Sequence, residues 1–446
     1  MKKKVLLFAR SFLAEYYSDI ASDIIEPIFV TLTVNEKNFL QKKGWKIYGC
    51  FEEEYDTLPI ADYPSDYLKT SFASDRFLNR FSYEKRLEIL GKEISFWKRI
   101  FDETKPAALF NETVAVEIAE VMAIEAEKRG IPFYTALLGF LPNTFYWKPD
   151  PFTGRLNDLS GIEPSDEDLK KADEYIENVT KKAQVPFYVK SFVGKSPKSF
   201  TKFIMGTVLG LRRYVKECRR LSKPGFHYED YRKYCFEYSK FFLKSLFYKY
   251  DSIKAVNGYP YVFLPLHMEP EATISYFVFE DYRQDFLIDF VVKSLRQGQY
   301  LVVKEHPQQP GLLLARRFRL LKKQYPNLIY VPSNTPSYGI IQSCDCIVTL
   351  TSSAGWEGLL QKKPVFVMGK IFFDQCPGAI RVDSISELKM YLREANYPIV
   401  SDDDIRLFVA RMISLFHPGC PTPSVTDSGI KEYVLAMETI ISGGKI

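Results

Sequence analysis

The chain has 446 residues, 46% of them apolar and 26% charged, a composition typical of a globular protein with room for two domains. No window holds the roughly 18 apolar residues that a membrane-spanning helix needs, which argues against an integral membrane protein. Seven scattered cysteines favour a reducing, cytosolic compartment over a disulfide-built secreted domain. The N-terminal "MKKKVLLFAR" lacks a signal-peptide cleavage site and is expected to be a first strand.

The net charge of +5 is unevenly distributed. Residues 195–254 hold fifteen Lys/Arg against five Asp/Glu, a net charge of +10, whereas the rest of the chain carries −5. Fourteen Phe and Tyr residues are interleaved with these cations. Such a segment suits an anionic membrane surface, and the alternative is a pair of domain-linking helices whose aromatic residues are core. Nucleic acid is not expected as a partner, because no reading module is present.

The first half of the chain alternates short apolar segments with helical patterns, which predicts a parallel sheet covered on both faces. The helix with the strongest signal, 114–130, has acidic residues early, basic residues late and a closing Gly130. The stretch "PSDEDLKKADEYI" predicts a capped helix. Expected strands are 5–10, 26–33, 45–51, 106–111 and 131–137.

A second alternating series follows the basic segment, which itself reads as two helices split at Pro224-Gly225. Two Rossmann-like, doubly wound α/β domains facing a central cleft are the simplest architecture. The expected domains are 1–190, a basic aromatic helical segment 191–257, a nucleotide-sugar-binding domain 258–400, and C-terminal helices 401–446 that pack back on the first domain. Expected strands are 261–267, 300–304, 327–332, 346–351 and 364–369, and expected helices are 283–297, 311–325, 336–343, 353–362, 386–395 and 402–416.

Ligands of doubly wound sheets bind beyond the carboxyl ends of the strands, so the residues there are the first candidates. After strand 346–351 come Ser352, Ser353 and Gly355, which would offer hydroxyls, backbone N–H groups and a helix dipole to a phosphate. The alternative is a plain N-cap. Glu357, one turn on, would hold a ribose or be a solvated acid of the first turn.

After strand 300–304 come Glu305, His306 and Pro307. The proline ends the strand and restricts His306 to extended geometry, so the ring is fixed to donate to a phosphate or act as an acid. The alternative is a loop histidine without a role. Lys304 would add positive charge, and Glu305 would tune the histidine or face solvent. The second His-Pro pair, His417-Pro418, follows a helix and is read as a helix stop.

Three further carboxylates follow strands. Glu269 and Glu271 would bind a sugar hydroxyl, or would be the acidic start of a helix. Glu112, in the first domain, is a candidate catalytic carboxylate, with a first-turn helix acid as the alternative. No P-loop, no GxGxxG fingerprint and no His/Cys spacing for a metal is present, and the acids at 401–405 are better explained as an N-capped helix start.

The segments "VVKEHP" and "SNTPSYGIIQSCDCIVTLTSSAGWEGLLQKKPVFVMGKIFFD" resemble the capsule polysaccharide biosynthesis family, which includes bacterial β-Kdo glycosyltransferases. The resemblance covers about residues 258–380. It implies a GT-B fold and a transferase that needs no metal or other cofactor. It also implies that His306, Ser352 and Ser353 contact the phosphate of a CMP-sugar and that Glu112 is the catalytic carboxylate. The segment "LHMEPEAT" departs from the family's usual pattern at Met268-Glu269.

The leading hypothesis is therefore a cytoplasmic or peripheral membrane glycosyltransferase that moves a sugar, Kdo from CMP-Kdo, to a glycan or glycolipid of a surface polysaccharide. Stabilising the leaving phosphate and supplying a carboxylate to the acceptor or the sugar are the chemical requirements of that reaction. Two alternatives stay open. One is a nucleotide-sugar epimerase of the same fold, and the other is a non-catalytic factor that binds polysaccharide or lipid.

Overall fold

The computed structural model divides the chain into two compact units. Among the described residues, unit 1 holds those of Met1–Thr153 and Leu415–Ile446, and unit 2 holds those of Gly154–Val208 and Arg232–Ser414. The C-terminal stretch of the chain therefore returns to unit 1. The structure describes residues 2–70, 72, 78, 81–181, 240–269, 271–278, 283–395, 397, 400–421 and 430–444.

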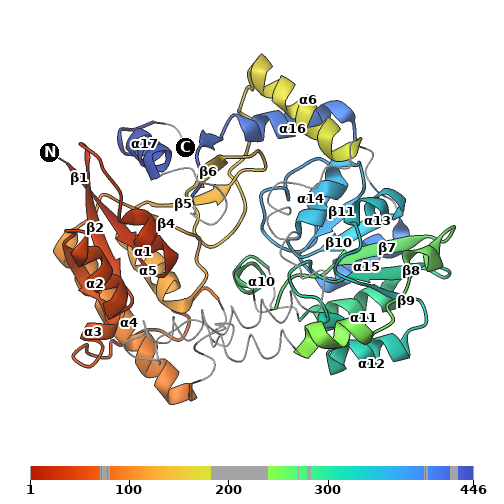
Figure 1. The fold of residues 1–446 in the computed structure, drawn as a ribbon, viewed down its shortest axis with the longest axis horizontal. Helices are drawn as coiled ribbons and strands as arrows, with labels where there is room; N and C mark the ends of the chain where they lie inside the picture. The colour runs from red at the N-terminus through yellow and green to blue at the C-terminus, as the bar shows by residue number, and fades with distance from the viewer. Residues whose placement is uncertain are drawn as a thin grey trace. The chain divides into compact units, whose positions relative to one another are not determined.

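The sheet of unit 1 is mostly parallel, in the order β13-β6-β5-β4-β1-β2-β3 (Figure 1). Strands β1 to β5 pair in parallel, β6 runs antiparallel to β5, and β13 runs antiparallel to β6. The strand order reverses between β1 and β4, so this is the switch point of the sheet. The strands span Lys3–Phe8 (β1), Ile25–Thr31 (β2), Ile47–Cys50 (β3), Ala108–Asn111 (β4), Phe133–Leu138 (β5), Thr144–Lys148 (β6) and His417–Pro418 (β13).

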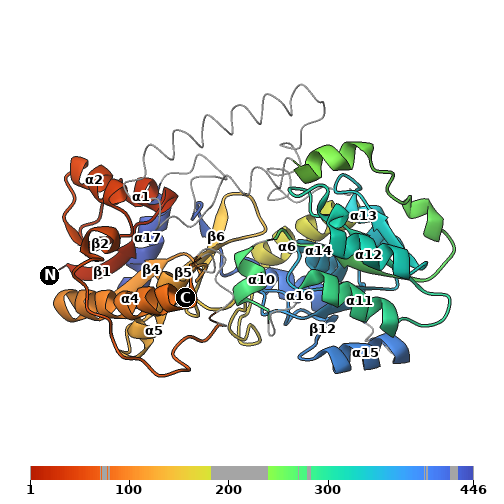
Figure 2. The ribbon, with the colours of Figure 1, turned by 90° about the horizontal axis from the view of Figure 1, so that it is seen from below.

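Helices cover both faces of this sheet. Phe110 and Trp147 belong to a buried cluster that includes residues of α1 and α17. Helices α4 and α5 lie on the opposite face (Figure 2), where the indole of Trp97 packs edge-on against Phe8. The helices span Phe12–Tyr17 (α1), Val34–Lys42 (α2), Phe51–Glu54 (α3), Tyr83–Thr104 (α4), Glu117–Glu127 (α5) and Ile430–Ile441 (α17).

The sheet of unit 2 is entirely parallel in the described residues, in the order β12-β11-β10-β7-β8-β9. If the six strands are numbered in chain order and read across the sheet from β9, they have the 3-2-1-4-5-6 order of a doubly wound nucleotide-binding sheet. The switch point of this sheet lies between β7 and β10. The strands span Tyr261–Pro265 (β7), Tyr300–Lys304 (β8), Leu328–Val331 (β9), Cys346–Thr349 (β10), Val365–Val367 (β11) and Ala379–Arg381 (β12).

Helices also cover both faces of the second sheet. Ile288, Phe318 and Leu388, from α11, α12 and α15, pack into one buried cluster with alternate strand residues. On the other face, the fully buried Trp356 of α14 donates its indole N–H to the Tyr175 hydroxyl of α6. The helices span Asp166–Thr180 (α6), Ala272–Tyr276 (α10), Gln284–Ser294 (α11), Arg316–Gln324 (α12), Ser337–Ser343 (α13), Ser353–Leu360 (α14), Ile385–Glu394 (α15) and Asp402–Ile413 (α16), with 3₁₀ turns at Ile253–Val256 and Leu312–Leu314.

The predicted α/β class, with two doubly wound units, is confirmed, and each predicted strand is present within two residues of its expected ends. The capped helices at 166–180 and 402–413 are also present, with the side chains of Ser165 and Ser401 as N-caps. Strands β6, β12 and β13 were not expected. Residues 154–181, which the sequence placed in the first domain, group with unit 2. Of the C-terminal helices expected to pack on the first domain, α17 does belong to unit 1, whereas α16 groups with unit 2.

The interpretation of His417-Pro418 as a helix stop is wrong. Helix α16 already ends at Ile413, and the His-Pro pair forms the edge strand β13, whose residues pair with Phe145 and Thr144 of β6. Proline is tolerated there because an edge position does not need every backbone N–H. The partner strand lies about 270 residues earlier, so no local pattern revealed it.

Candidate functional site

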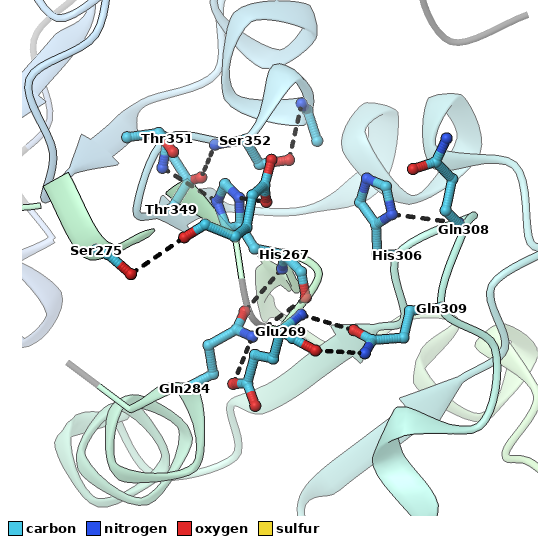
Figure 3. Close-up of polar contacts among 12 residues, drawn as sticks. His267, Glu269, Ser275, Gln284, His306, Gln308, Gln309, Thr349, Thr351 and Ser352 are labelled. Atoms are coloured by element: carbon cyan, nitrogen blue, oxygen red, sulfur yellow. Dashed lines mark hydrogen bonds and ion pairs between the residues drawn. The ribbon is translucent and has the colours of Figure 1, made fainter. Parts of the chain in front are cut away.

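Three chain segments meet at the carboxyl edge of the sheet in unit 2 (Figure 3). They follow β7, β8 and β10, which are neighbours in the sheet, and β7 and β10 flank its switch point. Ligands of doubly wound sheets bind at this place. The segments at 304–309 and 350–357 carry the residues predicted to bind the nucleotide, and the segment after β7 carries Glu269 and Glu271, which were predicted to bind a sugar.

His306 is held in one orientation and one protonation state. Its Nδ1 accepts the backbone N–H of Gln308 at 3.2 Å (Figure 3), so the proton of the neutral ring lies on Nε2. Burial lowers the pKa of His306 to about 4, and the nearby Glu271 only partly opposes this shift. At neutral pH the side chain is therefore an uncharged hydrogen-bond donor through Nε2.

A second histidine, His267, joins two of the segments. It is 5% exposed, and its Nε2 accepts the backbone N–H of Thr351 at 3.2 Å. Its Nδ1 therefore carries the proton and faces a carboxylate oxygen of Glu271 at 3.4 Å. The side chain of Gln284 holds both the N–H and the C=O of His267, at 2.7 and 3.2 Å. His267 thus fixes the turn after β10 to the end of β7.

The hydroxyl groups in the turn after β10 differ in whether they have partners within the protein. The Ser352 N–H donates to Thr349 Oγ1 at 2.9 Å, and Ser352 Oγ caps α14 by accepting the N–H of Ala354 at 3.3 Å. The N-cap alternative therefore holds for Ser352. Ser353 is partly exposed, and its hydroxyl has no hydrogen-bond partner among the described residues. The Thr351 hydroxyl is buried and also without a partner in this part of the chain.

Lys304 and Glu357 lie close enough to influence each other's ionisation. Burial lowers the pKa of Lys304 to about 8, against the opposing effects of Glu357 and Glu305. Burial raises the pKa of Glu357 to about 7, against the opposing effect of Lys304. Glu357 is partly exposed and lies beyond the first turn of α14, so it is not the first-turn acid of the alternative interpretation. Both side chains therefore have a pKa close to neutral pH.

Both carboxylate oxygens of Glu269 have partners within the protein. One carboxylate oxygen accepts from Gln284 at 2.7 Å, and the other is paired with Arg317. The side-chain amide of Gln309 accepts from the backbone N–H of Glu269 and donates to its C=O, each at 2.8 Å. The structure therefore gives this residue a role in fixing the segment after β7, where the sequence suggested a sugar contact.

Glu271 is the N-cap residue of α10, as the helix-start alternative predicted, although its side chain makes no capping bond. Burial would raise its pKa, but the hydrogen bond with His267 and the electrostatic effects of His267 and His306 outweigh burial and lower it. A carboxylate between two histidines is thus retained at this edge of the sheet.

Glu305 neither tunes His306 nor faces solvent. It is 1% exposed, and both carboxylate oxygens accept from the Tyr250 hydroxyl at 3.0 Å. One of these oxygens also accepts the backbone N–H of Leu313 at 3.0 Å. Burial raises the pKa of Glu305, while these hydrogen bonds favour the ionised form. Glu305 therefore anchors the loop that carries His306.

Gly355 serves packing. A Cβ atom at this position would lie 2.9 Å from Thr349 Cγ2 and 3.2 Å from Val365 Cγ1, so the glycine lets α14 approach β10 and β11. Its backbone N–H is already used by Ser352 O at 2.9 Å. The structure thus gives no support to a direct phosphate contact from Gly355.

In unit 1, the candidate Glu112 lies at the switch point between β1 and β4. It follows β4, and its carboxylate forms an ion pair with Arg10, which follows β1. The side-chain oxygen of Asn111 accepts a hydrogen bond from the backbone N–H of Glu112 at 2.8 Å. This bond fixes the backbone that carries the carboxylate. Helix α5 begins only at Glu117, so Glu112 is not a first-turn helix acid.

The basic segment 195–254 lies outside the described residues except for 240–254. Within that stretch Phe247 is 88% exposed and Leu246 is 50% exposed, beside Lys244 and Lys249. In the part of the chain that the structure describes, no helix combines the length and apolarity needed to cross a membrane. In the same residues, no three His, Cys, Asp or Glu side chains group as ligands of a metal would.

Sequence reasoning missed His267, Thr351 and Arg10. His267 and Arg10 each come within two residues of the end of the strand at their sheet's switch point, a signal that the strand pattern contains once the strand order is known. Thr351 was treated as the end of a strand. The contact between His267 and Thr351, which lies 84 positions later, cannot be predicted from any of these patterns.

Comparison with known proteins shows a similarity over part of unit 2. Residues 249–395 match the family described as "Capsule polysaccharide biosynthesis protein". The capsule polysaccharide export protein KpsS of Escherichia coli is 32% identical over 104 residues, which are 22% of this chain. This chain spans about a quarter of the length of that relative, 26%.

Two solved structures illustrate the similarity in three dimensions. The β-Kdo 2,7 transferase of KpsC from Thermosulfurimonas dismutans is 13% identical, with 81% of this chain and 98% of that chain covered, at a TM-score of 0.40. The UDP-GlcNAc 2-epimerase from Neisseria meningitidis is 10% identical, with 99% and 100% covered, at a TM-score of 0.28. Over residues 249–395, this family match confirms the resemblance inferred from the sequence.

Proposed function

We propose that this protein is a glycosyltransferase of bacterial surface-polysaccharide synthesis that transfers Kdo from CMP-Kdo to a glycan or glycolipid acceptor. The observation that carries the proposal is that His306, after β8, and the turn that contains Ser353, after β10, lie at the same carboxyl edge of the sheet of unit 2. The family match covers the same residues. The choice of Kdo and CMP rests on the resemblance of the segments "VVKEHP" and "TSSAGWE" to transferases of that family.

The donor phosphate would be held by uncharged and charged donors together. His306 offers its Nε2–H, and Ser353 offers a hydroxyl at the first residue of α14, where the helix dipole favours an anion. Lys304 adds positive charge below the turn when it is protonated. These groups would stabilise the negative charge that develops on the leaving phosphate. We therefore expect transfer to continue in the presence of a metal chelator.

We assign the catalytic carboxylate to Glu112. A glycosyl transfer needs a carboxylate that deprotonates the acceptor hydroxyl or traps the sugar covalently. Glu112 lies at the switch point of its own sheet, and its side chain is 27% exposed, so it is accessible to a substrate. Arg10, paired with it, would hold the carboxylate in position.

The acceptor side and the location in the cell are part of the same proposal. The cations and aromatic residues of 195–254 would bind the anionic inner face of the cytoplasmic membrane, where a lipid-linked acceptor is presented. The exposed Phe247 and Leu246 would enter the interfacial region beside Lys244 and Lys249. Each cation near such a surface contributes on the order of 1 kcal/mol.

The proposal is tested by thermal denaturation with nucleotides, followed by a transfer assay. CMP is expected to raise the Tm of the purified protein, UDP is not, and CMP-Kdo should be consumed only with an acceptor. Consumption of a UDP-sugar without an acceptor, observed by NMR, would identify an epimerase instead. If Glu112, His306 and Ser353 can all be replaced without loss of polysaccharide in cells, the protein is a non-catalytic factor.

A further inference from the structure

Lys148 is a buried cation in unit 1 with no hydrogen-bond partner among the described residues. It ends β6 and is 1% exposed, and its Nζ atom is covered by the surrounding chain. A buried ammonium group without a partner is costly, and proteins normally pair such a charge. The position therefore calls for an explanation beyond packing.

Thr135 of β5 stands directly opposite Lys148 in the antiparallel pair and points to the same face of the sheet. It is fully buried, and its hydroxyl also has no partner in the described part of the chain. One acidic side chain influences Lys148, that of Asp150. Its two oxygens already accept from Phe152 N at 2.8 Å and from the Thr153 hydroxyl at 2.7 Å.

This pair adjoins the segment that contains Glu112. Thr135 is in register with Asn111, the last residue of β4, and Glu112 comes next in the chain. The N–H of Val114 donates to the C=O of Pro151 at 2.9 Å, so the chain after Glu112 is tied to the chain after Lys148. An ammonium and a hydroxyl that have no partner among the described residues therefore lie in the same part of unit 1 as the candidate catalytic carboxylate.

We propose that Lys148 and Thr135 form an anion subsite of unit 1 that binds the carboxylate of an acidic sugar. An ammonium and a neighbouring hydroxyl are suitable donors for a carboxylate, because hydrogen bonds between charged groups are about twice as strong as neutral ones. The subsite itself follows from the geometry of the two side chains. Its ligand being a sugar acid rests on the proposed function.

Binding is tested by the shift in Tm of the full chain with free Kdo, Kdo methyl ester, glucose 1-phosphate and glucose. Because the surrounding chain covers the Nζ atom of Lys148, a sugar needs time to reach it. Protein and sugar are therefore incubated together before heating. We expect Kdo to raise the Tm of the wild type and the methyl ester and glucose to leave it unchanged. An equal shift with the ester, no shift with Kdo, or a shift with the sugar phosphate alone would overturn the carboxylate subsite.

The variants Lys148→Met and Thr135→Val assign the shift to these two residues. Lys148→Met should abolish the shift with Kdo and raise the Tm of the protein without sugar, because it removes an uncompensated buried charge. Thr135→Val should reduce the affinity for Kdo about 10- to 150-fold, the loss of one hydrogen bond to a charged group. A wild-type shift in either variant contradicts the proposal.

The matched control is Lys92→Met, also in unit 1. Lys92 is 9% exposed but donates to Tyr55 O at 2.8 Å, so its replacement should lower the Tm and leave the shift with Kdo unchanged. If Lys148→Met lowers the Tm as Lys92→Met does, Lys148 has a structural partner and the subsite is refuted. The CMP shift is measured on the same samples. If CMP gives no shift while Kdo does, the result counts against the proposed donor and not against the anion subsite.

Discussion

Replacing His306 with alanine should weaken CMP binding about 10- to 150-fold. The neutral ring would donate one hydrogen bond from Nε2 to a charged phosphate, and such a bond contributes about 1.5–3 kcal/mol. No charge is lost at neutral pH, because burial keeps the pKa of His306 at about 4. Isothermal titration calorimetry of the wild type and of His306→Ala with CMP measures the difference.

The control is His417→Ala, which removes the histidine of the other His-Pro pair, in β13 of unit 1. Its Kd for CMP should equal that of the wild type. A change in Kd of less than about threefold for His306→Ala would refute the inference that this ring binds the phosphate, since even a weak neutral hydrogen bond contributes about 0.5–1.5 kcal/mol.

The same side chain predicts a pH dependence of stability. The pKa of His306 is about 4 in the folded protein and 6.5 in the unfolded chain, so below pH 6.5 the unfolded chain binds the proton first. The folded protein should therefore lose up to about 3 kcal/mol of stability from this group as the pH falls from 6.5 to 4. Urea denaturation of His306→Gln should show a correspondingly smaller loss, and an equal loss would contradict the burial of a neutral ring.

Glu112→Gln should lower kcat about 10²- to 10⁴-fold with the Kd for CMP unchanged, and a rate within tenfold of the wild type would exclude it as the catalytic carboxylate. Gly355→Ala should lower the free energy of unfolding by about 1–3 kcal/mol, because its Cβ would lie 2.9 Å from Thr349 Cγ2. The control Gly339→Ala, in helix α13 with no atom within 4 Å, should be neutral or stabilising by up to about 1 kcal/mol, and equal losses in the two variants would contradict the packing role. Glu305→Gln should cost about 1–3 kcal/mol by urea denaturation, since it weakens the hold on Leu313 N, and no loss would refute the anchoring role.

The sequence predicted most of the architecture because alternating strands and helices leave strong local patterns. The ends of β8 and β10 could be located from Pro307 and from the two serines, and the structure brings His306 and the serine turn to one edge of the sheet. The pairing of strand β13 with β6 depends on contacts between distant parts of the chain. No local pattern contains that information.

The roles of individual polar residues were harder to predict than their positions. Glu305 and Glu269 follow strands as ligand-binding residues do, yet both are occupied by hydrogen bonds within the protein. Conversely, Lys148 is an ordinary residue of the sequence "TFYWK", and only its burial opposite Thr135 distinguishes it. Which groups a side chain contacts, and how deeply it is buried, are properties of the folded chain. These properties distinguish structural carboxylates from candidate site residues.

A crystal structure of the protein with CMP bound tests the donor site most directly. We predict that the phosphate lies within hydrogen-bond distance of His306 Nε2 and of the Ser353 hydroxyl, at the N-terminus of α14. A phosphate bound away from the switch point between β7 and β10, or contacting neither residue, would contradict the proposed donor site.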